Sequence, residues 1–128
     1  LVKTMLESTN INQKQLMAMS ELFNNFKVFQ PAVNPTTLAD LFSGKLKKPL
    51  VVRNARLLCY IMDCLSQALL ISNIWQSVAD RTECFVSVKG KPITRNTLSS
   101  AKYCAVKFDT IPEKATIRQY IGILKGLK

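Results

Sequence analysis

The sequence contains no histidine, which removes the side chain that most often performs acid-base catalysis near neutral pH. Its eight acidic residues are scattered along the chain, and no two of them form an obvious catalytic pair. Neither a GxSxG motif nor a Walker phosphate-binding loop is present. The sequence therefore predicts a protein that is not an enzyme and has no cofactor.

Cysteines are few, and their spacing does not match a compact zinc site. The four lie at positions 59, 64, 84 and 104, with no CxxC pair among them. We expect reduced, mostly buried thiols in a cytoplasmic protein, with no bound metal, although a four-cysteine site assembled from distant elements stays open. An enzyme with Cys84 or Cys104 as its nucleophile would lack a histidine to activate the thiol.

Long apolar runs are also absent. The longest spans residues 57–71, which is shorter than the roughly 20 residues needed to cross a bilayer. It contains Asp63, Ser66 and Gln67, and the first residues, LVKTMLES, do not resemble a secretory signal. We therefore expect no membrane association. Residues 1–128 are predicted to form a single helical domain, which could be a segment of a longer protein.

The most strongly patterned stretch is residues 53–71. On a helical wheel its polar face carries Cys59, Tyr60 and Asp63, while a broad opposite arc is apolar. An arc this wide must contact several partners. The sequence thus predicts an all-α or mainly α fold, a compact bundle of six or seven helices around this central helix. The arc contains Leu57, Leu58, Ile61, Met62, Cys64, Leu65, Ala68 and Leu69.

Other helices are predicted on both sides of this stretch. Residues 12–26 and 35–43 each have one apolar face, and Asn34 before Pro35 is typical of a helix start. A shorter helix carries Trp75, which is expected in the core. Residues 30–33 and 45–49 are predicted connectors. Alternating side chains predict a short extended arm or wing near 84–92, before a helix that Thr94 caps.

The charge is unbalanced: 18 Lys and Arg stand against 8 Asp and Glu, a formal net charge of +10. Residues 45–107 hold 11 basic and 3 acidic residues, so most of the excess lies there. A positive surface of this kind favours a polyanionic partner. The helix after the arm opens with Arg95 and Asn96, whose side chains suit guanine and adenine edges in a DNA major groove.

These features predict a nucleic-acid-binding module with double-stranded DNA as the partner. Its order of elements resembles a helix-turn-helix only loosely, because more than ten residues separate the basic helix from the Trp75 helix. Arg53 and Arg56 are the central helix's contribution to the basic face. Residues predicted to face bases are Arg95, Asn96, Ser99 and Lys102, and those predicted to contact phosphates are Lys45, Lys47, Lys48, Lys89, Lys91 and Lys107.

Two other interpretations remain open at this level. The basic, serine-rich helix could simply face solvent, as charged helix faces commonly do. Alternatively, the protein is an interaction or assembly module in which the apolar faces of helices 12–26 and 35–43 form a groove for a partner protein or a second copy in a homodimer. That alternative requires Phe23, Phe26 and Phe42 to be exposed.

Overall fold

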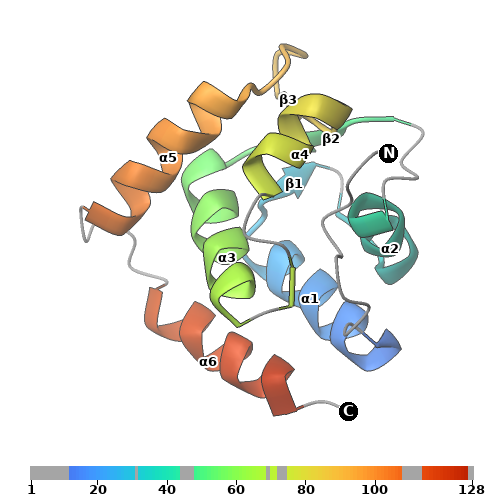
Figure 1. Cartoon of the computed structure of the whole chain (residues 1–128). Helices are drawn as coiled ribbons and strands as arrows, with labels where there is room; N and C mark the ends of the chain where they lie inside the picture. Colours follow the sequence, from blue (N-terminus) through green and yellow to red (C-terminus); the bar gives the residue numbers. More distant parts are fainter. Residues whose placement is uncertain are drawn as a thin grey trace.

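A computed structural model of the protein describes residues 12–30, 32–43, 48–68, 70–71, 75–107 and 114–126. Figure 1 shows a central helix, α3, surrounded by other helices, with short strands near its first turn. The elements in chain order are α1 (Gln13–Asn25), β1 (Phe29–Gln30), α2 (Pro35–Ser43), β2 (Leu50–Val52), α3 (Ala55–Gln67), α4 (Trp75–Thr82), β3 (Phe85–Ser87), α5 (Arg95–Lys107) and α6 (Lys114–Gly126).

The prediction of a compact bundle of six or seven helices is wrong, because three strands of the chain form a small mixed sheet. Its strand order is β1-β2-β3. β1 pairs antiparallel with β2, Phe29 opposite Val52, and β2 pairs parallel with β3, Val52 opposite Ser87. β1 and β2 were missed because strands of two and three residues are too short to show an alternating pattern.

The arm predicted at residues 84–92 is a strand of this sheet followed by a tight turn, which we call the hairpin turn (residues 88–91). Val86 bridges to Pro92 across the turn, and the Ser87 amide donates a hydrogen bond to the Lys91 carbonyl at 2.8 Å. Gly90 has a φ of 82°, a left-handed conformation that glycine adopts without steric cost. Pairing with β2 therefore fixes the arm on the domain.

The central helix is shorter than residues 53–71 and is covered on both faces. Asn54 caps its start, where its side chain accepts a hydrogen bond from the Leu57 amide at 3.1 Å. Cys59 and Tyr60, predicted on the polar face, are only 0% and 8% exposed. They are buried because α5 and α6 pack over that face. The polar face of this helix is therefore covered at these two positions.

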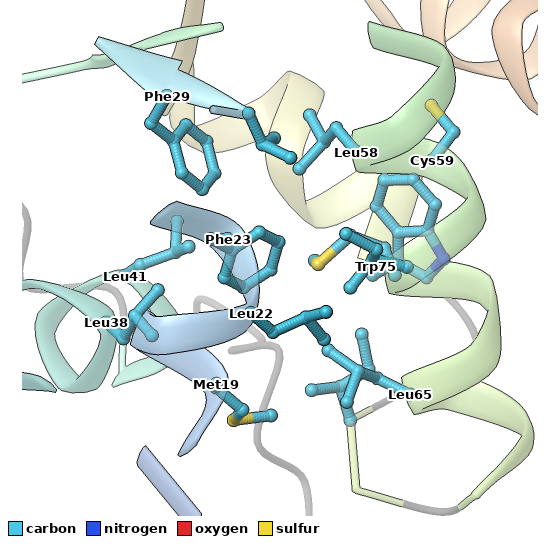
Figure 2. Packing of buried hydrophobic residues seen from close by; sticks show 14 of the residues in the cluster. Met19, Leu22, Phe23, Phe29, Leu38, Leu41, Leu58, Cys59, Leu65 and Trp75 are labelled. Carbon is cyan, nitrogen blue, oxygen red and sulfur yellow. The ribbon is translucent and has the colours of Figure 1, made fainter. Parts of the chain in front are cut away.

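One continuous core joins the elements around α3. Figure 2 shows Phe23 of α1 between Leu41 of α2 and Trp75 of α4. The ring of Phe29 in β1 packs against the ring of Phe23 in α1 and the ring of Phe85 in β3. The ring centroids are 5.1 Å and 6.0 Å apart, respectively. Trp75 is 1% exposed, which confirms its predicted place in the core.

The apolar faces proposed for an interaction groove are largely used inside the chain. Phe23 and Phe42 are completely buried, and Phe26 packs against the core and is partly buried. α1 and α2 contact each other directly. These faces therefore do not form an open groove between residues 12–26 and 35–43. In the part of the chain that the structure describes, no helix combines the length and apolar character needed to span a membrane.

The ring of Phe85 tests whether the sheet is part of the core. Phe85→Ala should lower the free energy of unfolding by about 3–5 kcal/mol, because the truncation leaves a cavity beside Phe29. Urea denaturation measures the loss. Met17, which is 53% exposed, provides the control, and Met17→Ala should change stability by about 0.5 kcal/mol or less. Equal effects of the two substitutions would contradict this packing.

Candidate nucleic-acid interface

Helices α3 and α5 lie side by side and run in the same direction. The Cys59 thiol of α3 donates to the Leu98 carbonyl of α5 at 3.4 Å, and one turn later Asp63 forms an ion pair with Lys102 at 3.2 Å. The two contacts advance together along both helices. The first turns of α3 and α5 therefore lie at the same end of the molecule, as Figure 1 also shows.

The sheet places the hairpin turn at this same end. Val52, the last residue of β2, lies opposite Ser87, the last residue of β3, so Arg53 and the hairpin turn both follow this end of the sheet. Arg56 follows in the first turn of α3, and Arg95 begins α5. We call the five exposed cations gathered here the basic end: Arg53, Arg56, Lys89, Lys91 and Arg95.

No carboxylate of the described residues forms an ion pair with a member of the basic end. By contrast, Lys102 is paired with Asp63 farther along α5. The N-terminal ends of the α3 and α5 dipoles add partial positive charge. Asp80 lies near them and accepts a hydrogen bond from the Arg95 backbone amide at 3.2 Å. The local charge remains strongly positive and open to solvent.

Two of the residues predicted to face bases hold α5 on the domain. The Ser99 hydroxyl donates to the Gln76 side chain of α4 at 2.9 Å, and Lys102 is the ion-pair partner of Asp63. Arg95 and Asn96 are exposed at the start of the helix. The structure thus brings Arg95 and Asn96 to the basic end and engages Ser99 and Lys102 in contacts between helices. The exposed residues farther along α5 include Thr97, Ser100 and Tyr103.

The predicted phosphate contacts are separated in space. Lys89 and Lys91 lie in the hairpin turn. Lys48 precedes β2, whereas Arg53 follows it, so Lys48 lies at the other end of that strand. Lys107 is the last residue of α5, about 18 Å along the helix axis from Arg95. Its side chain, and the whole of Lys45 and Lys47, lie outside the described part of the chain.

Arg53 and Arg56 are placed more centrally than the sequence indicated. Their position depends on β2, whose sequence Leu50-Val51-Val52 leads into α3 through Arg53 and Asn54. The sequence signal that could have located them is the pair of β-branched residues Val51 and Val52 shortly before the helix cap Asn54. Recognition of β2 alone would still not have identified β3 as its parallel neighbour.

A second cationic surface lies in a groove between α3 and α6. Its lining includes Arg118 and Lys125 together with Gln67 and Ala68 at the end of α3. Tyr60 accepts a hydrogen bond from Arg118 Nε at 3.0 Å. Gln67, the last residue of α3, and Lys125, in the last turn of α6, both line this groove. The groove holds two cations, whereas the basic end holds five.

The described cysteines do not provide a reactive or metal-binding site. Burial raises the pKa of the Cys59 thiol to about 12, and burial also raises the pKa of Cys64. Cys84 is buried as well, and its thiol donates to the Ala79 carbonyl at 3.9 Å. A thiol with a raised pKa is a poor nucleophile at neutral pH. Within the described ranges, no three His, Cys, Asp or Glu residues form a group that could hold a metal.

The raised pKa of Cys59 predicts a loss of stability in alkali. Above pH 9 the unfolded thiol ionises while the folded thiol, with a pKa of about 12, stays protonated, so rising pH favours unfolding. Between pH 9 and 11 this residue should lower the unfolding free energy by about 1.4 kcal/mol per pH unit. Cys59→Ala should show a correspondingly shallower decline in urea titrations. Parallel declines in the two proteins would contradict the assignment.

Comparison of the chain with protein-family models, curated protein sequences and solved structures finds no match in any of the three. The case for a function therefore depends on the protein's own residues and their arrangement. Among these, the basic end gathers five exposed cations near the starts of α3 and α5.

Proposed function

We propose that the protein is a non-enzymatic nucleic-acid-binding module and that its basic end contacts the phosphate backbone. The observation that carries this proposal is the convergence of five exposed cations from three separate segments, without an ion-pair partner among the described residues. Phosphate contacts by Lys and Arg release condensed counterions and supply much of the affinity for DNA. The proposed location of the protein is the cytoplasm.

Double-stranded DNA is the expected partner because a helix start adjoins the phosphate-binding cations. α5 lies on the outside of the domain (Figure 1), and an α-helix fits the major groove, which is about 12 Å wide. Arg95 and Asn96 would meet base edges there, while Lys89 and Lys91 reach the neighbouring backbone. Ser99 and Lys102 act in this arrangement as residues that position α5.

The shape of the basic end favours an extended polyanion over a small one. Its cations are spread over the end of β2, the hairpin turn and the starts of two helices. All five side chains are exposed and so present their charge to solvent. Successive phosphates along a strand could contact successive members of this set, which a small anion could not do.

Salt dependence and paired charge variants test the proposal. If Arg53, Arg56, Lys89 and Lys91 contact phosphates, the logarithm of the association constant for a duplex should fall with log[salt] at a slope of about −3.6. Lys89→Gln/Lys91→Gln should reduce the magnitude of this slope by about 2 and weaken binding. Fluorescence anisotropy with a labelled random-sequence duplex measures both quantities.

Lys14→Gln/Lys125→Gln is the matched control, because it removes the same charge from exposed positions on α1 and α6. Lys14 is in the first turn of α1, whereas α1 ends next to the sheet, so Lys14 is far from the basic end. The control should leave the slope nearly unchanged. The proposal fails if the protein does not bind duplex at low salt, or if both double variants weaken binding equally.

A further inference from the structure

Lys27 occupies a backbone conformation that glycine usually provides. Its φ is 52°, in the left-handed region, directly after the end of α1. The Lys27 amide donates to the Asn24 carbonyl at 3.1 Å and the Val28 amide to the Phe23 carbonyl at 3.0 Å. This is the hydrogen-bond pattern of a Schellman motif, in which glycine is the preferred residue at this position. A lysine here lowers stability, because its Cβ crowds the backbone.

The turn after α4 repeats the same motif with the opposite charge. Glu83 has a φ of 51°, its amide donates to the Asp80 carbonyl at 3.3 Å, and the Cys84 amide donates to the Ala79 carbonyl at 3.4 Å. Lys27 and Glu83 are the two non-glycine residues with positive φ in the described part of the chain. Lys27 and Glu83 therefore allow the effect of a positive and a negative side chain to be compared in the same kind of turn.

The two turns lie at opposite ends of the sheet. Next to Lys27, the Arg53 amide donates to the Val28 carbonyl at 2.8 Å, which extends the pairing of β1 with β2 toward the basic end. Next to Glu83, the Leu50 amide donates to the Cys84 carbonyl at 2.8 Å, at the start of β2. The positively charged turn is thus the one beside Arg53. The negatively charged turn adjoins Asp80, whose carboxylate accepts a hydrogen bond from the Arg95 amide.

We propose that Lys27 is a further phosphate contact beside the basic end, and that its strained conformation persists because the ammonium group is needed there. The inference rests on the proposed nucleic-acid binding. Lys27 is exposed, and no ion pair joins it to the residues that the structure describes. Residues held in unfavourable backbone conformations concentrate at functional sites, where function offsets the loss of stability.

Glycine substitutions at the two turns separate strain from charge. Lys27→Gly and Glu83→Gly should each raise the melting temperature by a few degrees, because both relieve the left-handed strain. Lys27→Gly should also weaken duplex binding several-fold and reduce the magnitude of the salt slope by about 1. Glu83→Gly should keep the slope of the unmodified protein. Thermal unfolding and fluorescence anisotropy on the full chain give both results.

Two further variants show whether charge is responsible. Lys27→Asn, which tolerates the left-handed region without a charge, should bind as weakly as Lys27→Gly, and Lys27→Arg should bind like the unmodified protein. Unchanged affinity and slope in Lys27→Gly and Lys27→Asn, with weaker binding by Lys89→Gln/Lys91→Gln, would overturn the role of Lys27 alone. Absence of duplex binding by the unmodified protein would overturn the proposed function as well.

Discussion

The junction between β2 and α3 determines where the basic end of this domain lies. Only Arg53 and Asn54 separate the strand from the helix, so the first turn of α3 must begin at the end of the sheet. Asn54 fixes that start through its hydrogen bond to the Leu57 amide. Because β3 runs parallel to β2, the hairpin turn emerges at the same end. The parallel packing of α5 on α3 then adds the start of a second helix.

Polar side chains on α3 serve mainly to hold its neighbours. Tyr60 accepts a hydrogen bond from Arg118 of α6, and its ring centroid lies 5.4 Å from the Lys114 ammonium. Asp63 binds Lys102 of α5 and accepts a hydrogen bond from Gln67. These contacts explain how a helix with a polar face can be covered on two sides. Arg56 and Arg95, at the beginning of α3 and α5, are exposed to solvent.

The helices were largely predictable because their ends carry local signals. Asn34 accepts a hydrogen bond from the Thr37 amide at 2.7 Å, and Thr94 accepts one from the Thr97 amide at 3.4 Å, as capping residues do. The sheet was not predictable, since strands this short depend on tertiary pairing. Charge counting located the basic region near residues 45–107, but it could not show that Lys102 pairs with Asp63 or that Ser99 binds Gln76.

The most direct measurement of the central claim is a two-dimensional NMR titration of the isotope-labelled protein with a short DNA duplex. The account predicts that the largest amide shift changes fall at Arg53, the hairpin turn and residues 95–96, with small changes in α6. Arg53 is distant in sequence from the other two segments, and pairing of β2 with β3 and packing of α5 on α3 bring them to one end of the domain. Changes concentrated on α6, or none at low salt, would contradict a nucleic-acid interface at the basic end.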